Sequence, residues 1–370
     1  MISFGPTEEQ DLIRETMREF ALAEMRDIAR DADEKSELPG EFLQTSWELG
    51  LVNSSIPEEY GGGGMDRSPV TSVIFQEELG YGCASLAAAA LAPSLFIHPL
   101  LDFGTDEQKA KYLPLFAESE FHAASLALQE SSFAFDPGSL RTIAEPKGDG
   151  FSLTGVKRLV PLGDRASHFL VVARSGARTG LADLEAFIVP RDAAGLTISE
   201  EAEKTLGLKS LPCSQLTLEN VEVPAEDRLG GSSGIDGARL VNACRVGSLA
   251  LALGIARGMM EFAIPYAKER VAFGQPIAQK QTIAFMLADL QIEVNTMRWM
   301  IWKAASQLEN GLDATPATAL ARTYVVREAM KAADNGLQVF GGHGFIRDYP
   351  VEMWYRNART VTVLDALASA

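Results

Sequence analysis

The residues that most often bind metals or form disulfides are few and scattered in this chain. The cysteines lack the CxxC spacing of a zinc or redox pair, and the histidines do not cluster. Their positions are Cys83, Cys213, Cys244, His98, His122, His168 and His343. This scatter argues against a disulfide framework and against a metal site, and it favours a reducing interior.

The net charge and the pattern of apolar residues argue against a nucleic-acid-binding, a secreted or a membrane protein. A formal net charge of −17 over 370 residues opposes nucleic-acid or anionic-membrane binding as a main role. The opening "MISFGPTEEQDLIRE" turns polar too early for a signal peptide. The longest apolar stretch, "ASLAAAALAPSLFIHPLL", is interrupted by Pro93, His98 and Pro99, which favours a buried helix over a membrane span. We therefore expect a cytoplasmic globular protein with no membrane or nucleic-acid partner.

Helical signals dominate the chain up to about residue 120. Thr7 and Gln10 in "TEEQ" have the spacing of a capping box, and Thr105 and Gln108 repeat it in "TDEQ". An apolar stripe with helical periodicity follows the first box. The four glycines of "PEEYGGGGMD" predict a turn between helices.

The periodicity then changes twice. Short β-rich runs such as "HFLVVARS" and "LEAFIVP" predict a small antiparallel sheet. Three long apolar repeats after it predict a helical bundle. No GxGxxG follows a strand, so the order is not that of a Rossmann fold. We expect three domains, at residues 1–120, 121–228 and 229–370.

Six motifs, in order along the whole chain, resemble the acyl-CoA dehydrogenase family. They are "TEEQDLIRETMREFA", "LGLVNSSIPEEYGGGG", "FGTDEQKAKYLP", "VEVPAEDRLG", "KERVAFGQPIAQKQTIAFMLADL" and "LQVFGGHGFIRDYPVEMWYRNAR". The resemblance implies a mainly α fold with a β domain: an N-terminal helical domain, a middle antiparallel β domain and a C-terminal four-helix bundle. It also implies a tetramer or dimer.

Enzymes of this family use FAD to remove the α-proton and β-hydride of an acyl-CoA thioester. A carboxylate takes the proton, and electrons commonly pass to an electron-transfer flavoprotein. The flavin ring rests on the β domain of one subunit, and the bundle of the neighbouring subunit binds the pyrophosphate and adenosine. The resemblance implies the same cofactor, substrate class and acceptor for this chain.

The motifs that bind the adenosine half are intact. By resemblance, the residues that bind this half of FAD are Arg270, Phe273, Gln281, Gln338, Gly341 and Gly342. The planar fork of Arg270 suits a pyrophosphate, and glycines let backbone amides approach a cofactor closely. The alternative is that Phe273 is a core residue and that the glycines only end a helix.

The motifs that bind the ring are altered. In "LALQESSFAFDPGSLRT", residues 126–142, Phe133 and Phe135 stand where the family has small or hydroxyl residues. The family motif W-I-T-N reads "LVPL" here, so Leu159 replaces the tryptophan that walls the ring. Pro161, which has no backbone N–H, replaces the threonine that supports the flavin N5. A site that binds flavin through its backbone alone is the alternative.

The catalytic base is altered as well. The family glutamate of Y-E-G-T corresponds to Asp365, which is one methylene shorter. A misplacement of about 1 Å can cost about 100-fold in rate. Other members carry the glutamate just before an arginine on an earlier helix, where this chain has Cys244 and Arg245. We expect Cys244 to be core packing, and Arg245 lies either near a substrate or in an interface ion pair.

These differences predict a subunit that contributes the adenosine half of a shared FAD site and has lost its own ring site. The asymmetry resembles heteromeric α2β2 acyl-CoA dehydrogenases, which act on CoA thioesters of steroid side chains. The prediction is therefore a heterotetramer with a second acyl-CoA dehydrogenase subunit. One alternative is a self-sufficient homo-oligomeric flavoprotein dehydrogenase or oxidase with Asp365 as its base. A second is a non-enzymatic family member that binds DNA or protein, which the acidic charge disfavours.

Overall fold

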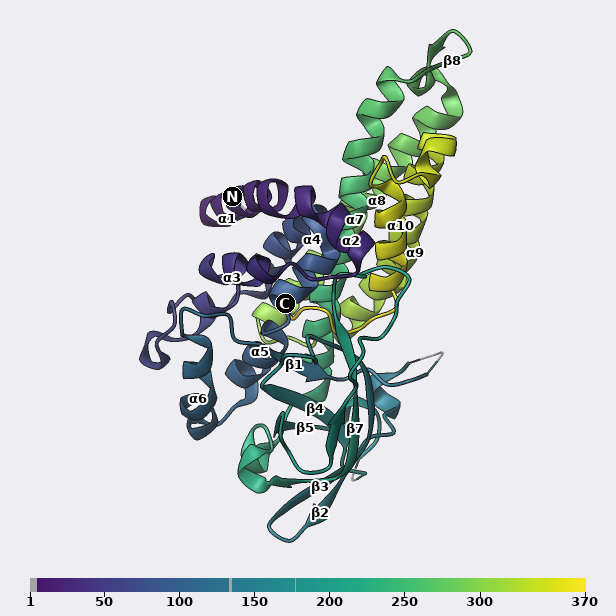
Figure 1. Ribbon diagram of the computed structural model, residues 1–370. Helices are drawn as coiled ribbons and strands as arrows, with labels where there is room; N and C mark the ends of the chain where they lie inside the picture. The colour runs from purple at the N-terminus through teal and green to yellow at the C-terminus, as the bar shows by residue number, and fades with distance from the viewer. Residues whose placement is uncertain (1–4, 133–134, 177) are drawn as a thin grey trace.

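The chain begins as a layer of helices in the computed structural model, which describes residues 5–132, 135–176 and 178–370 (Figure 1). The helices are α1 (Glu8–Phe20), a π-helical turn (Ala21–Arg26), α2 (Asp27–Lys35), α3 (Gly40–Glu48), α4 (Pro69–Leu91), α5 (Ser94–Phe103) and α6 (Asp106–Tyr112). Both predicted capping boxes are present. Thr7 Oγ1 accepts from the Gln10 N–H at 3.2 Å, and Thr105 Oγ1 accepts from the Gln108 N–H at 3.2 Å.

The apolar stretch that the sequence assigned to a buried helix forms the end of α4 and most of α5, with a 59° bend between the two helices. Both helices are largely buried within the protein. Within the described part of the chain, one unbroken helix, Gly237–Glu269, is long and apolar enough to cross a membrane. Its most apolar window is 83% buried inside the protein, as in a core helix.

A seven-stranded sheet follows, in the order β1-β4-β2-β3-β7-β6 with β5 beside β4. Its strands are β1 (Ala124–Ala127), β2 (Ile143–Lys147), β3 (Gly150–Pro161), β4 (His168–Arg174), β5 (Leu184–Pro190), β6 (Leu196–Ile198) and β7 (Cys213–Pro224). Most pairs are antiparallel, as expected, but β4 runs parallel to β1 and β2. A parallel pair needs a long connection, which the chain between β1 and β4 provides. The β3–β7 ladder is irregular between Lys157 and Val160, the segment in which the altered "LVPL" motif begins.

Four helices form the last block, and their packing against α4 is close. They are α7 (Gly237–Glu269), α8 (Gln281–Glu309), α9 (Thr315–Phe340) and α10 (Val351–Val361), with a hairpin of β8 (Val271–Ala272) and β9 (Gln275–Pro276) between α7 and α8. A Cβ added at Gly254 of α7 would lie 2.3 Å from the carbonyl oxygen of Glu77 in α4. The two backbones therefore touch, and buried Arg257 pairs with Glu77 and Glu78 across the same contact.

The bundle projects away from the sheet (Figure 1). The β8–β9 hairpin lies at its far end, whereas β2 and β3 lie at the opposite end of the molecule. The hairpin that carries predicted adenosine-half residues is thus separated from the sheet, whose strand β3 ends in the altered "LVPL" motif.

Candidate cofactor site

The far end of the bundle carries most of the residues predicted to bind the adenosine half of FAD. A cavity of about 420 Å³ opens there. Its predicted lining residues are Arg270, Phe273, Gln338, Gly341 and Gly342. Gln281 begins α8 nearby but is exposed and is not among the residues that line the cavity. Its role stays a prediction.

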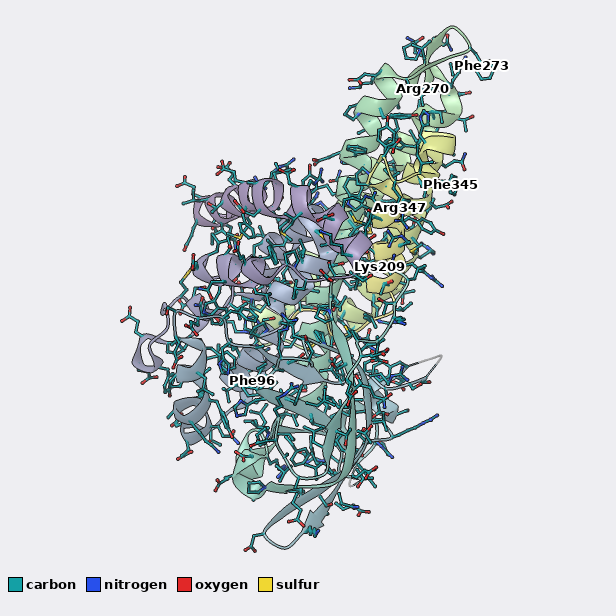
Figure 2. The ribbon with its side chains drawn as sticks, viewed as in Figure 1. Phe96, Lys209, Arg270, Phe273, Phe345 and Arg347 are labelled. Carbon is teal, nitrogen blue, oxygen red and sulfur yellow. The ribbon has the colours of Figure 1, made fainter. Side chains whose placement is uncertain are left out.

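Arg270 and Phe273 are positioned by the tight connection between α7 and the hairpin. The Arg270 N–H bonds the Tyr266 carbonyl at 2.8 Å, which ends α7, and the side chains of Arg270 and Phe273 lie at the tip (Figure 2). Phe273 has a positive φ of 55° and is 95% exposed. The alternative that Phe273 is a core residue is therefore wrong.

The glycine pair does more than end α9. Gly341 has φ 56° and ψ −133°, a conformation that is accessible almost only to glycine. A Cβ added to Gly341 or Gly342 would have no atom within 4 Å, so the backbone on this side is open to a ligand. The pair thus combines a required backbone turn with free space.

Two cations in the cavity have no carboxylate partner among the described residues, although the Lys280 ammonium lies 5.8 Å from the centroid of the Phe273 ring. Among the described residues, no carboxylate lies within ion-pair distance of Arg270 or Lys280, although both line the cavity. Tyr266 stacks on Phe340 with ring centroids 4.0 Å apart and bonds His343 Nδ1 through its hydroxyl at 2.9 Å. Unpaired cations beside open backbone and stacked rings suit an anionic, aromatic ligand.

Three lining residues with polar side chains were not among those predicted to bind the adenosine half of FAD. They are Tyr266, Lys280 and His343. Each lies close in sequence to a residue that was: Tyr266 is one helical turn before Arg270, Lys280 precedes Gln281, and His343 follows the glycine pair. Helical spacing was the available signal for Tyr266, since residues four apart share a face.

The predicted ring half has a different character, because its polar groups already bind the chain itself. Leu159 has a positive φ of 52°, and its backbone N–H donates to the carboxylate of Glu203. The guanidinium of Arg158 pairs with the same carboxylate. Phe135 packs against the hydrophobic core, and Phe133 lies outside the described residues.

A buried ion pair lies behind this strand. Lys157 is fully buried and donates to Glu130 Oε1 at 2.7 Å. Glu130 also accepts from the backbone N–H of Arg141 at 2.6 Å and of Thr142 at 3.0 Å. Burial lowers the pKa of the Lys157 ammonium to about 8. These contacts hold the strand in place and leave no donor of Lys157 directed at a ligand.

Asp365 is buried and occupied. Its Oδ2 accepts from Arg245 Nη2 at 2.9 Å and its Oδ1 from Arg322 Nε at 2.8 Å, with the side chain 2% exposed. Arg245 therefore forms an ion pair within its own chain. Cys244 is fully buried, and desolvation raises the pKa of its thiol to about 12, as expected for a core residue.

FAD, the cofactor that the resemblance implies, fits one half of this geometry and not the other. At the bundle end, Arg270, Lys280 and the open glycine backbone could hold the pyrophosphate and adenosine. On the sheet, Glu203 takes the Leu159 N–H and adds negative charge, and Pro161 has no N–H to offer. Among the described residues, neither Leu159 nor Pro161 therefore offers a free backbone N–H to the ring.

Comparisons with known proteins agree with the arrangement of the three blocks. Family models match residues 7–120 (acyl-CoA dehydrogenase, N-terminal domain), 125–221 (middle domain) and 238–365 (C-terminal domain). The chain is 34% identical to an acyl-CoA dehydrogenase of Bacillus subtilis over 369 residues, covering 97% of this chain and 94% of that protein. It is 31% identical to a short-chain specific acyl-CoA dehydrogenase of Clostridium acetobutylicum over 367 residues, covering 98% and 96%. The solved butyryl-CoA dehydrogenase of Megasphaera elsdenii superposes with a TM-score of 0.88 at 28% identity, covering 99% of this chain and 96% of that one.

Proposed function

Because this chain belongs to the acyl-CoA dehydrogenase family, whose fold it has and whose cofactor is FAD, we propose that it acts in a shared flavin site. It is one subunit of a FAD-dependent enzyme that dehydrogenates acyl-CoA thioesters at the α and β carbons. This subunit contributes the pyrophosphate and adenosine half of the site, and a second acyl-CoA dehydrogenase subunit seats the ring.

One contrast carries the proposal. At the bundle end, two cations and a glycine backbone face an open cavity, and neither cation has a carboxylate within ion-pair distance among the described residues. At the sheet, the Leu159 N–H is bonded to the internal carboxylate of Glu203. A binding group that already has a strong internal acceptor must give it up before it can hold a ligand. The first half is ready for a cofactor and the second is not.

A row of exposed apolar side chains on α8 supports the proposal that a second subunit binds here. Phe285, Ile292 and Trp299 are spaced seven residues apart and are 60%, 60% and 50% exposed. This spacing places them on one helix face, and Leu320 of α9 is exposed too. Exposed apolar rows of this kind mark protein interfaces. The bundle of the second dehydrogenase subunit is the occupant that we propose for this face.

The other elements of the proposal follow from the family. The substrate is an acyl-CoA thioester, and an electron-transfer flavoprotein takes the electrons. Three free cysteines fit the cytoplasmic location that the sequence predicted. A steroid side chain as the acyl group stays a prediction, because the relatives named above are short-chain and butyryl-CoA dehydrogenases.

The self-sufficient alternative depends on Asp365. Each oxygen of this carboxylate already accepts from an arginine, Arg245 or Arg322, and its side chain is 2% exposed, so it serves a buried internal ion pair. This observation favours the shared site over a homomeric flavoprotein with an aspartate base. The DNA-binding alternative has no supporting observation, and the net charge of −17 opposes it.

The test is the flavin content of the chain purified alone and with a co-expressed complete acyl-CoA dehydrogenase. We expect a colourless lone chain and a yellow, active complex. In that complex, Arg270→Ala should lower the flavin-to-protein ratio. Lys268→Ala, which removes an exposed cation outside the cavity two residues earlier, should leave the ratio unchanged. A yellow and active lone chain would overturn the proposal.

A further inference from the structure

Residues 364–370 run into the interior of the molecule instead of along its surface. After α10 the chain turns inward, and Figure 1 marks Ala370 amid the molecule, between the N-terminal helices and the sheet. Leu367, Ala368 and Ala370 are fully buried, and Ser369 is 1% exposed. The segment is neither helix nor strand. Its backbone must therefore find its hydrogen bonds elsewhere.

Side chains of the surrounding helices supply most of those bonds. Ser248 Oγ accepts from the Leu367 N–H at 3.0 Å, and Ser94 Oγ accepts from the Ser369 N–H at 3.2 Å. Gln76 Nε2 donates to the Ser369 carbonyl at 2.9 Å, and Arg67 Nη2 donates to the Ala370 carbonyl at 2.5 Å. These groups project from α4, α5, α7 and the loop before α4. Together they surround the segment with polar groups, and we call the space that it fills the channel.

The channel is shaped closely to the segment on one side. A Cβ added at Gly247 of α7 would lie 2.7 Å from the Ala368 carbonyl oxygen. The segment itself is weakly anchored by apolar contacts, since from Ala366 onward its one large side chain is Leu367. Alanine and serine bury little apolar area. Leu367 is therefore the main apolar anchor of this segment.

Several polar atoms of the lining stay without a partner even with the segment in place. Among the described residues, Gln76 Oε1, His98 Nδ1 and Arg67 Nε of the lining are buried and make no hydrogen bond, and neither does Ser369 Oγ of the segment itself. Gln76 is 0% and His98 4% exposed. Such atoms are costly to bury, so the segment is an incomplete match for its channel. A ligand with both donors and acceptors at this end would match it better.

The end of the channel that contains Arg67 and His98 adjoins an opening at the surface. Arg67 and His98 also line a separate opening of about 150 Å³, whose wall includes the apolar side chains of Met17, Met65 and Phe75. An apolar mouth that leads to buried polar groups suits an elongated apolar ligand with a polar end.

We propose that residues 366–370 are a displaceable internal occupant of a channel that binds an acyl chain carrying an oxygen function, a hydroxyl or carboxyl, at one end. While the segment is seated, the interior next to Asp365 is closed to such a ligand. Displacement by the ligand opens it. The choice of an acyl chain as the ligand class rests on the proposed function, whereas the displaceable segment rests on the contacts alone.

The test uses the lone chain and a fluorescent fatty acid, cis-parinaric acid, so its outcome does not depend on flavin or partner. Leu367→Asp places a charge in the channel and should expel the segment, and the probe should then bind about 10- to 100-fold more tightly, because the competent fraction rises. Gly247→Ala presses on Ala368 from α7 and should shift affinity in the same direction. Val363→Asp, the same change at a half-exposed position just outside the channel, should leave affinity unchanged.

Hydrogen exchange on the unaltered chain covers the case in which these variants do not fold. Saturating probe should speed exchange at Leu367 and Ala370 while it slows exchange in α4 and α7. Equal probe affinity in the unaltered chain and both channel variants would overturn the proposal. So would probe binding that protects residues 366–370.

Discussion

Replacing Asp365 with asparagine separates a structural carboxylate from a catalytic one. The change removes the charge and keeps nearly the same shape. In the native protein this carboxylate balances Arg245 and Arg322, whose side chains are 18% and 34% exposed. Removing one member of a buried pair costs about 3–5 kcal/mol, because the remaining charge stays uncompensated. Since Arg322 is about a third exposed and water screens it, we expect a loss of about 2–4 kcal/mol.

The assay is thermal unfolding of the lone chain. In a chain of 370 residues, a loss of that size should lower Tm by roughly 3–5 °C. Asp348→Asn is the matched control, because Asp348 is exposed and forms no ion pair among the described residues. Its Tm should stay within about 1 °C, as for most surface changes. Adding Arg322→Met to Asp365→Asn should recover part of the loss, since one uncompensated cation is then removed.

The opposite result would contradict this reasoning. If Asp365→Asn kept its Tm but abolished activity in a yellow homomer, Asp365 would be a base free to accept a proton. The self-sufficient alternative would then be correct.

Three further changes test the packing, the histidines and the partner face. Gly254→Ala should destabilise the chain by about 1–3 kcal/mol in denaturant unfolding, because the added Cβ would lie 2.3 Å from the Glu77 carbonyl oxygen. Gly40→Ala is the control and should be neutral, because a Cβ there would have no atom within 4 Å. Burial lowers the pKa of His168 below its ordinary 6.5, so the unfolded chain takes up the proton at a higher pH than the folded chain does. The stability of the folded chain should therefore fall as the pH drops through 6.5. In thermal scans, this fall should be less steep for His168→Gln. Ile292→Glu should weaken association with the co-expressed dehydrogenase at least tenfold in analytical ultracentrifugation, and an unchanged affinity would remove α8 from the interface.

Local sequence signals predicted the helices and strands well. The contacts of the candidate site were harder to predict, because they join residues that are far apart in the sequence. Both capping boxes could be found because a box is a four-residue pattern. The bundle-end residues were predicted through the resemblance to the family, whose motifs hold Arg270 and Phe273 close together and include the glycine pair. Glu203 could not be connected to Leu159, since 44 residues separate them and no local pattern encodes the contact.

The same limit applies to Asp365 and the segment after it. Arg322 meets Asp365 across 43 residues, which no local spacing indicates. Residues 366–370 carry mostly small side chains with no helical or strand periodicity, so their sequence does not indicate that they are buried. Their burial follows from the serines of α5 and α7, which bond the backbone and not the side chains.

The remoteness of the β8–β9 hairpin from the sheet also has a thermodynamic consequence. The bundle tip points away from the sheet of the same molecule, so in the proposed shared site one compound bridges two polypeptides. Its release and the parting of those polypeptides then become linked equilibria. Dilution alone should strip such a compound from the protein, and a saturating supply of it should hold the assembly together.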